Sequence, residues 1–504
     1  MSDRFLRATL ILTFALALGA RFWRIDAPPG DFHPDRQYNT TLLARFFYCR
    51  DNPAVPAWMQ DVARANREDV VMRNEIPLTE WLAARVGRTL GHECFWPMRS
   101  VASLAWVLGG VFLWLTARRF VTGEAAAAGT AFYLLSPFAI LLSRSLQPDS
   151  LMVMGCLAAV WAACRYDESP TRARLLAAGL VAGVAILLKP GITQFAIWGV
   201  FVALSAARLG WRGILHGASL WVFTVLAALP SALYLAGNVI GGDVATVFRQ
   251  NFVPKFLLAA TFWRGWVGTL LAVLGVGGLV LGLGGLGAAV LLRRGRFGAL
   301  CLGWGAGYAA QCLLTATATS SHDYYHAPAI PLFALGLAAL AEPVLRVISR
   351  PGAPAAARHL LLPGAIVACF AAGSVRAEWR QDAAKECDIA MWREVGEAVG
   401  HSPRTVFLDY CYGRPLCHHG WVSGRWWPQT HNLEYDERFY GVERIPAPER
   451  FRRDYAAQNP DYFIVRNIPD YDRQPDLRAF LESHFAARAR TGRYLIFDLR
   501  SPLH

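Results

Sequence analysis

The sequence predicts a mainly α-helical membrane protein: a bundle of about eleven transmembrane helices followed by a small α/β soluble domain. Of its 504 residues, 54% are hydrophobic and 17% are charged, whereas soluble globular proteins carry about 25% charged residues. The shortage of charge is confined to residues 1–376, which hold apolar runs long enough to cross a bilayer at about 20 residues each. Residues 377–504 have an ordinary soluble composition, so we expect a domain boundary near residue 376.

The apolar runs give the predicted spans in order. They are residues 5–23, 98–117, 126–143, 149–164, 173–188, 191–207, 215–236, 266–292, 297–317, 326–345 and 359–376. The first run resembles a signal peptide, but Arg21, Trp23 and Arg24 follow it where a small-residue cleavage site would stand. We therefore interpret it as a retained first span.

The arginines between the spans set the orientation. With the N-terminus in the cytoplasm, the cytoplasmic loops contain Arg118, Arg119, Arg165, Arg172, Arg174, Arg208, Arg212, Arg293, Arg294, Arg296, Arg346 and Arg350. This alternation fits the positive-inside rule. It supports the number of spans and predicts that the first loop and the C-terminal domain lie on the outer side, which for a bacterial inner membrane is the periplasm. The net charge of +13 is explained by these loops, and we expect no nucleic-acid partner.

The first outer loop, residues 24–97, is too long for a simple connection. It opens with Asp31, His33 and Asp35. Farther on, residues 71–91 repeat apolar side chains at helical spacing, and Pro77 suits a first helical turn. This segment predicts an amphipathic helix in contact with membrane lipids.

Further polar side chains lie at the outer ends of predicted spans, where they are costly and tend to be functional. They are Arg144, Asp149, Lys189, His322, Asp323, Tyr324 and Tyr325. Each has a structural alternative. Lys189 could extend to the lipid headgroups, the two tyrosines could form an aromatic belt, and Asp149 could cap the next helix. Their gathering on one membrane face favours an active site.

The C-terminal residues alternate between strand-like and helical stretches, which predicts the α/β domain. The strand-like runs are residues 405–410, 461–467 and 493–499, and the helical ones are residues 382–399 and 475–485. Between them, residues 412–427 are rich in Gly, His and Trp. We interpret this stretch as a structural or substrate-facing loop.

The ten cysteines do not indicate a disulfide framework, because half lie in or beside predicted spans. Two pairings on the outer side stay open, Cys411 with Cys417 and Cys49 with Cys94. Neither arrangement forms a metal-binding pattern.

Four stretches together resemble the GT-C membrane glycosyltransferases that use polyprenyl-phosphate sugar donors, in particular the protein O-mannosyltransferase and aminoarabinose transferase superfamily. They are PPGDFHPDRQYNTTLLAR, NEIPLTEWLAARVGRTLG, SRSLQPDSLMV and HDYYHAPAIPLFALGLAAL. They occur in the order in which that superfamily arranges its first outer loop, the helix after it, the next outer loop and a late span. The resemblance covers about residues 5–376.

The resemblance implies a mechanism and roles. An inverting glycosyl transfer needs one base, which falls on Asp35, with Asp149 as a second candidate catalytic carboxylate. The leaving phosphate needs fixed cations, for which Arg144, Lys189, Arg73 and Arg36 are candidates. His33, Asp323, Tyr324 and Tyr325 are candidate substrate-binding residues. The partners implied are the polyprenyl-linked sugar donor and an acceptor that is a protein, a lipid or a glycan.

The sequence departs from the superfamily at two places. The usual Asp-Glu pair reads Asp35-Arg36, and Glu75 is followed by Ile76 where the aminoarabinose transferases have Lys. No cofactor is established by the sequence. A divalent metal held by Glu75 and His322 is one interpretation, and a helix-capping role for Glu75 is the other.

Three other classes of protein fit parts of the sequence. A polysaccharide ligase or polymerase would also use lipid-linked sugars, but it would depend on other outer-loop residues than Asp35. A transporter would show internal repeats and polar groups at mid-membrane depth, and neither is evident. A scaffolding membrane protein would leave the acidic first loop as solvated surface.

Overall fold

The structure is a computed structural model and describes residues 3–71, 75–239, 252–292, 295–348 and 388–503, together with residues 364, 367, 368 and 371. Its contacts divide the chain into two compact units. Unit 1 comprises Met1–Ile25, Asn74–Ile76 and Arg99–Arg380, and unit 2 comprises Asp26–Arg73, Pro77–Met98 and Gln381–His504. The first outer loop therefore groups with the C-terminal residues, a division that composition alone did not suggest.

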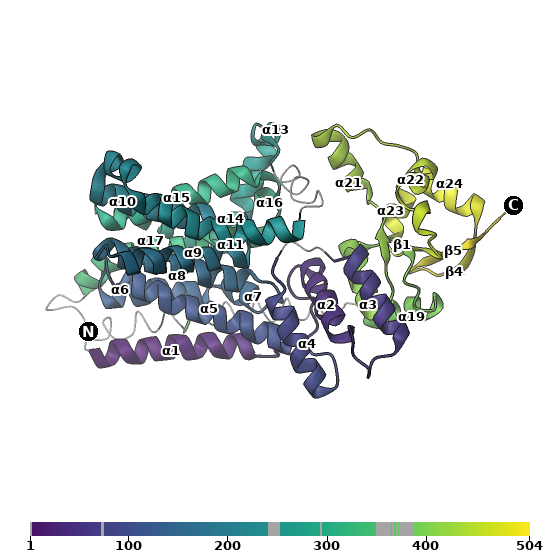
Figure 1. Ribbon diagram of the computed structural model, residues 1–504, viewed down its shortest axis with the longest axis horizontal. Helices are drawn as coiled ribbons and strands as arrows, with labels where there is room; N and C mark the ends of the chain where they lie inside the picture. The colour runs from purple at the N-terminus through teal and green to yellow at the C-terminus, as the bar shows by residue number, and fades with distance from the viewer. Residues whose placement is uncertain are drawn as a thin grey trace. The chain divides into compact units, whose positions relative to one another are not determined.

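Unit 1 is helical (Figure 1). Its elements are α1 (Asp3–Phe22), α5 (Trp96–Ala117), α6 (Gly123–Leu135), α7 (Pro137–Ser143), α8 (Asp149–Glu168), α9 (Arg172–Leu188), α10 (Gln194–His216), α11 (Ala218–Val239), α13 (Pro254–Leu257), α14 (Ala260–Leu291), α15 (Arg296–Leu314), α16 (Ala316–Ser321), the 3-10 turn η1 (Asp323–His326) and α17 (Ala329–Ile348). The long helices pack as neighbours, α10 with α15, α14 with α17, and α9 with both α8 and α11.

Within the described residues, seven helices are long and apolar enough to cross a membrane, and the bent pair of α6 and α7 raises the number to eight. The seven are α1, α5, α10, α11, α14, α15 and α17. Eleven spans are thus not confirmed. Helix α9 has only 17 residues, α8 carries charged residues at both ends, and the predicted span 359–376 lies outside the described residues apart from a few positions.

The predicted span 126–143 is broken rather than continuous. It bends by 56° between α6 and α7, at Ser136-Pro137, because proline has no N–H to continue the helical hydrogen bonds. The buried Arg21 of α1 lies at this break and donates hydrogen bonds to the carbonyl of Leu134 at 2.8 Å and the hydroxyl of Ser143 at 2.7 Å. A carbonyl freed by the bend is thereby paired inside the protein.

Glycines allow the closest helix contacts in unit 1. A methyl group placed on Gly199 of α10 would lie 2.1 Å from the carbonyl oxygen of Gly303 of α15. One on Gly285 of α14 would lie 1.9 Å from that of Gly336 of α17. Small residues at such crossings are typical of membrane helices, so the glycines of α14 form part of a packing surface.

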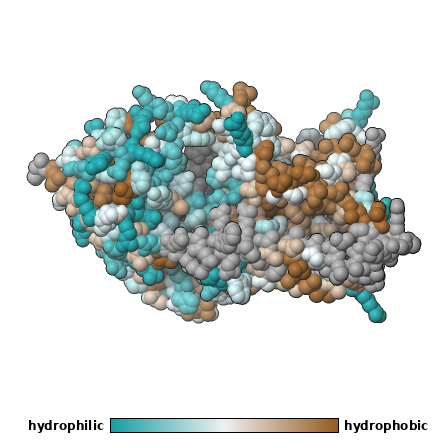
Figure 2. Space-filling model, turned by 180° about the vertical axis from the view of Figure 1, so that it is seen from behind, coloured by the Kyte–Doolittle hydropathy of each residue, from teal (hydrophilic) through white to brown (hydrophobic). Residues whose placement is uncertain are grey.

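Large apolar side chains cover much of the outer surface of unit 1, as Figure 2 shows by the brown patches. Examples at least half exposed are Leu180, Trp221, Leu233, Val276 and Leu302. A water-soluble protein rarely exposes so large a contiguous apolar surface. This surface supports a lipid environment for the helices.

Unit 2 contains a five-stranded mixed sheet in the order β2-β1-β3-β5-β4. Its strands are β1 (Thr405–Leu408), β2 (Gly424–Trp426), β3 (Tyr462–Val465), β4 (Phe485–Arg490) and β5 (Leu495–Pro502). Strand β1 runs parallel to β2 and β3, whereas β3–β5 and β5–β4 are antiparallel. The three predicted strands and a small C-terminal sheet are confirmed, and β2 and β4 were missed.

The other elements of unit 2 are helices and helical turns. They are α2 (Pro34–Cys49), α3 (Ala57–Asp69), α4 (Leu78–Leu90), α19 (Ile389–Ala398), η2 (Tyr410–Gly413), α20 (Arg414–Gly420), α21 (Thr430–Tyr435), the π-turn η3 (Asp436–Tyr440), α22 (Ala447–Asp454), η4 (Ala456–Gln458), α23 (Ile468–Asp472) and α24 (Pro475–His484). Predicted residues 382–387 lie outside the described residues. The predicted interfacial helix is α4, whose Leu78, Trp81 and Leu82 are exposed.

The sheet of unit 2 is buried on both faces because alternate residues of each strand point to opposite sides. One face packs with α2 and α19, and its core holds Leu42, Leu43 and Val395 against Phe407 and Ile464. The opposite face carries a second core. Helix α2, which comes from the first outer loop, is thus an integral layer of the C-terminal domain.

Candidate active site

The candidate residues fall into two groups, one in each compact unit. Unit 2 holds His33, Asp35 and Arg36. Unit 1 holds Glu75, Arg144, Asp149, Lys189, His322, Asp323, Tyr324 and Tyr325. Arg73 lies outside the described residues.

Asp35 lies in the first turn of α2. Proline at N1, here Pro34, begins this helix, and the preceding His33 has a left-handed backbone with φ 44°. The exposed N–H groups of a first turn favour a negative side chain. The Asp35 side chain is 23% exposed, so it keeps access to a reacting group while its charge is stabilised.

Arg414 is the ionic partner of Asp35 and was not identified from the sequence. Its Nη1 lies 3.8 Å from Oδ2 of Asp35 and donates a hydrogen bond of 3.2 Å to the Asp35 carbonyl. Burial lowers the pKa of Arg414, the Asp35 charge raises it, and nearby Arg36 lowers it further. The guanidinium groups of Arg36 and Arg414 therefore both lie close to the start of α2.

The segment that delivers Arg414 has an unusual backbone. Cys411 and Tyr412 both adopt left-handed conformations, with φ 50° and 56°, and Gly413 follows with φ 67°. Such conformations are uncommon for residues other than glycine and cluster at functional sites. Burial raises the pKa of Tyr412, and the charge of Asp35 raises it further, so this strained turn stands beside the candidate base.

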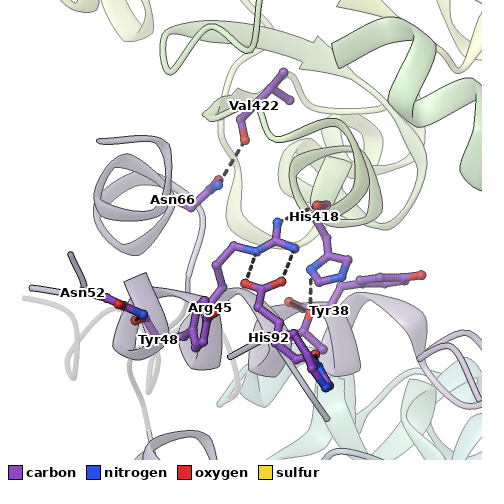
Figure 3. Close-up of polar contacts among 10 residues, drawn as sticks. Tyr38, Arg45, Tyr48, Asn52, Asn66, His92, His418 and Val422 are labelled. Atoms are coloured by element: carbon purple, nitrogen blue, oxygen red, sulfur yellow. Dashed lines mark hydrogen bonds and ion pairs between the residues drawn. The ribbon is translucent and has the colours of Figure 1, made fainter. Parts of the chain in front are cut away.

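Polar contacts within unit 2 fix the position of α2 against α20, as Figure 3 shows. Arg45 of α2 donates to both carboxylate oxygens of Glu93, at 2.7 and 2.8 Å, and to the carbonyl of His418 at 2.5 Å. Tyr38 makes a hydrogen bond of 2.8 Å with Nε2 of His419. The helix that carries Asp35 is therefore held by the loop that the sequence marked as rich in Gly, His and Trp.

His418 and His419 act here as neutral, structural side chains. Burial lowers the pKa of His418, and it lowers that of His419 to about 4, with the charge of Arg45 acting in the same direction. Their rings are used in packing, since His419 stacks on Trp392 at 5.3 Å between ring centres. None of Cys49, Cys94, Cys411 and Cys417 forms a disulfide bond, so neither open pairing is present in this structure.

In unit 1, three candidate residues surround Lys189, namely Asp149, Glu75 and Tyr324. Its Nζ lies 2.8 and 2.9 Å from the two carboxylate oxygens of Asp149 and 3.5 Å from Oε1 of Glu75. It also lies 5.1 Å from the centre of the Tyr324 ring, within the range of a cation–π contact. The Lys189 ammonium group is therefore paired with two carboxylates inside unit 1.

These contacts correct three structural alternatives. Lys189 does not extend to the headgroups, because its side chain is 5% exposed and paired. Asp149 does not cap α8, since Pro148 is the N-cap residue and no side chain caps that helix end. Glu75 does not cap α4 either: Pro77 is its N-cap residue, and the carbonyl of Glu75 accepts a hydrogen bond of 2.9 Å from Tyr234.

Arg144 lies at the end of α1. Its two Nη atoms donate to the carbonyls of Ala20 and Trp23, at 3.1 and 2.6 Å. A cation stabilises these carbonyls because the C-terminal end of a helix is partially negative. This position gives Arg144 a structural role in joining α7 to α1.

The aromatic candidates of η1 lie together. Tyr324 is 5% exposed, and its ring lies 5.2 Å from that of Tyr325 and 5.4 Å from that of His322. Asp323 occupies the first turn of η1. Burial excludes Tyr324 from a belt at the lipid headgroups and places it instead against the Lys189 cluster.

The metal assignment to Glu75 and His322 stays a prediction. Among the residues that the structure describes, no three His, Cys, Asp or Glu side chains lie together in a way that could hold a metal ion. Glu75 lies in the ionic cluster with Lys189, and Nδ1 of His322 makes a hydrogen bond of 2.7 Å with the hydroxyl of Ser321.

Comparison with known proteins identifies related sequences and folds. A family model described as dolichyl-phosphate-mannose-protein mannosyltransferase matches residues 74–236. That range contains Glu75, Arg144, Asp149 and Lys189. No curated protein matches the sequence.

Two solved proteins share the fold. The structure of ArnT from Cupriavidus metallidurans bound to undecaprenyl phosphate matches with a TM-score of 0.58 at 15% identity, over 97% of each chain. The oligosaccharyltransferase of Archaeoglobus fulgidus, in complex with zinc and sulfate, matches with a TM-score of 0.54 at 12% identity, over 95% of this chain and 71% of that one. The family model thus supports the resemblance over residues 74–236, and the solved structures show a shared fold over nearly the whole chain.

Proposed function

We propose that the protein transfers a sugar from a polyprenyl-phosphate donor to an acceptor hydroxyl or amine, with inversion at the anomeric carbon. The observation that carries the proposal is the fold shared with ArnT over nearly the whole of both chains. The ArnT structure binds undecaprenyl phosphate, the molecule that a polyprenyl-phosphate sugar leaves behind. The mannosyltransferase family model supports the same class of donor.

Asp35 is the proposed base. As the acceptor oxygen or nitrogen attacks the anomeric carbon, its proton passes to the Asp35 carboxylate. The bond between the anomeric carbon and the phosphate oxygen breaks, and polyprenyl phosphate leaves with the bonding electrons. The ion pair with Arg414 is long, at 3.8 Å, so it leaves the Asp35 carboxylate oxygens available to accept the acceptor's proton.

The surroundings of each candidate cation indicate which one suits the leaving phosphate. Arg36 lies in the first turn of α2, where the N–H groups of a helix N-terminus favour an anion. Lys189 is already paired with the carboxylates of Asp149 and Glu75. Arg144 is engaged by carbonyls of α1. We therefore assign the phosphate to Arg36 and a supporting structural role to Lys189.

The proposed location is a bacterial inner membrane, with the reaction on its outer face. The apolar surface of unit 1 and the arginine-rich loops support this orientation. A cysteine introduced at exposed Arg488 should react with a membrane-impermeant maleimide in cells with a permeabilised outer membrane. Protection of that cysteine until the inner membrane is broken would place the C-terminal domain on the other side.

The test of the function is release of polyprenyl phosphate by purified protein in nanodiscs supplied with polyprenyl-phosphate sugars. Asp35→Asn keeps the size of the side chain and removes the base, so release should fall by about 10² to 10⁴. Asp26→Asn, an exposed aspartate of the same loop, is the matched control and should behave as wild type. Normal turnover by Asp35→Asn would reject the assignment of the base.

A further inference from the structure

A cavity of about 440 Å³ lies within unit 2, beside the helix that carries Asp35. It is lined by Pro34 and Tyr38 of α2, by Trp392 of α19, and by Asp409, Tyr410 and Arg466 around the sheet. Pro34 precedes Asp35 by one residue and Tyr38 follows it by three. Its volume falls in the range of ordinary small-molecule sites.

Two buried polar atoms in the wall of this cavity have no partner. Nε of Arg466 donates to Oδ1 of Asp409 at 2.7 Å. The remaining Oδ2 of Asp409 and Nη1 of Arg466 have no hydrogen-bond partner among the described residues. Asp409 is 1% exposed, and a buried carboxylate with an unused oxygen is costly enough to call for an explanation. The wall thus offers one acceptor and one donor side by side.

Aromatic rings complete the surface. The Arg466 guanidinium lies over the rings of Trp392 and Tyr410, at 5.1 and 5.6 Å from their centres. Tyr410 is 45% exposed. It lies in the strained η2 turn, in which Cys411 has a left-handed backbone conformation. An exposed aromatic ring next to planar hydrogen-bonding groups suits a ligand with both an apolar face and hydroxyl groups.

The charges that line the cavity distinguish a neutral ligand from an anionic one. Arg466 is paired with Asp409, and the Nη atoms of Arg493 lie 2.6 Å from Asp388 and 3.3 Å from Glu394. No excess of positive charge remains to attract a phosphate. A hydroxyl group both donates and accepts, so neighbouring hydroxyls can satisfy the unpaired oxygen of Asp409 and the unpaired nitrogen of Arg466 together.

We propose that this cavity binds a neutral saccharide, whose ring stacks on Tyr410 and whose hydroxyls bind Asp409 and Arg466. The proposal rests on the transferase function for the role of that saccharide, which is the acceptor glycan. It deepens that function by choosing a glycan over a protein or a phosphorylated lipid headgroup as the group recognised at this cavity.

The test measures binding by saturation-transfer-difference NMR on the full-length protein in nanodiscs, without donor. The probes are neutral di- and trisaccharides of common hexoses, with inorganic phosphate as the anionic comparison. We expect the wild type to bind at least one saccharide. Tyr410→Ala should weaken that binding by about tenfold, the typical cost of losing a central aromatic contact, while Tyr410→Phe should keep it. Trp58→Ala removes an equally exposed aromatic ring of unit 2 that does not line this cavity and should leave binding unchanged.

Three outcomes would overturn the proposal. They are saccharide binding that survives Tyr410→Ala, binding that is lost in Trp58→Ala instead, and a wild type that binds none of the saccharides or only phosphate. Because no donor is present, these results are independent of the assay with Asp35→Asn. Failure of the binding site and failure of the transferase function are therefore distinguishable.

Discussion

Lys189 shows how a single buried residue is fixed by its partners. Its ammonium group contacts two carboxylates and an aromatic ring from segments far apart in the chain. A buried charge is tolerated only when it is paired, and removal of one partner leaves the other uncompensated. The stability of unit 1 should therefore depend on this cluster irrespective of any role in substrate binding.

A double-mutant cycle tests the cluster. Lys189→Met should destabilise the protein by roughly 3–5 kcal/mol, because Asp149 is then left charged and buried. The double variant Lys189→Met with Asp149→Leu should recover much of that loss. Thermal unfolding in detergent gives the stabilities, and donor KM gives the second readout. If the double variant is stable but no longer binds donor, the donor phosphate is bound by Lys189 and the assignment to Arg36 is wrong.

The histidines on α20 predict a pH dependence. In the folded protein, burial lowers the pKa of His419 to about 4, whereas the pKa of a histidine in the unfolded chain is about 6.5. The unfolded chain therefore binds more protons between these values, and stability present above pH 6.5 is lost as the pH falls toward 4. Between pH 6.5 and 4, the His419→Gln variant should lose less stability than the wild type, by roughly 1–3 kcal/mol. The unfolding temperature measured at each pH gives this difference.

Asp409 acts in the opposite direction over part of this range. Burial raises its pKa to about 6, against a lowering by Arg466, so its contribution is present at low pH and is lost as the pH rises through 6. Comparison of wild type with His419→Gln at each pH cancels this effect. Equal slopes for the two proteins would show that His419 titrates normally in the folded state.

At the scale of single residues, the sequence identified the candidate site residues, but it did not identify the residues that they contact. Lys189, Asp149, Glu75 and Tyr324 were each identified individually, and the structure brings them together. Arg414 was missed because its contact with Asp35 joins positions nearly 400 residues apart, and no local pattern marks such a pair. The Gly-rich stretch around it was the only available signal.

At the scale of elements, the break between α6 and α7 is the clearest departure from the predicted order. Hydropathy treats residues 126–143 as one run, since Ser136 and Pro137 barely change its average. The structure needs both the proline that ends α6 and a buried cation that binds the freed groups. Arg21 supplies that cation, with a further hydrogen bond of 2.9 Å to the carbonyl of Ala17 in its own helix.

Replacement of Arg21 should therefore loosen the break. Arg21→Met leaves Leu134 and Ser143 without their donor, at an expected cost on the order of 3–5 kcal/mol for several hydrogen bonds to a charged group. Arg7→Met, an exposed arginine of the same helix, is the control. Thermal unfolding in detergent should separate the two variants, and equal stabilities would mean that water or lipid pairs these groups.

The strands of unit 2 were better predicted than its smaller elements. Strands β1, β3 and β5 are apolar runs bounded by polar residues, and these are the central strands of the sheet. Strand β2 has three residues, and β4 reads FAARAR with most side chains exposed. Edge strands such as these bury too little apolar surface to leave a pattern in the sequence.

At the scale of the whole molecule, unit 2 is assembled from two distant parts of the chain. Leu42 and Leu43 of α2 belong to the same core as Val395 and Phe407 of the C-terminal domain. From the sequence we assigned the first loop to the membrane domain, because the loop connects two predicted spans. The pairing of the loop with the sheet is a long-range contact that composition cannot report.

This assembly predicts that the C-terminal residues do not fold alone. A fragment of residues 381–504 should aggregate or bind a hydrophobic dye, because the face that α2 covers would be open to water. Fusion of residues 26–98 to that fragment through a flexible linker should give a soluble monomer with a cooperative unfolding transition. Leu42→Asp in the fusion should undo the gain. A cooperatively folded fragment without the loop would contradict the shared core.

The same split core imposes a waiting period during synthesis. Helix α2 is complete roughly 340 residues before α19 and β1 can join it, which is about 17 to 70 s at ordinary translation rates of about 5–20 residues per second. During that interval Leu42 and Leu43 have no sheet to cover them. The core of unit 2 can therefore close only after the intervening helices of unit 1 have been synthesised, so the order of the chain sets the time at which this unit folds.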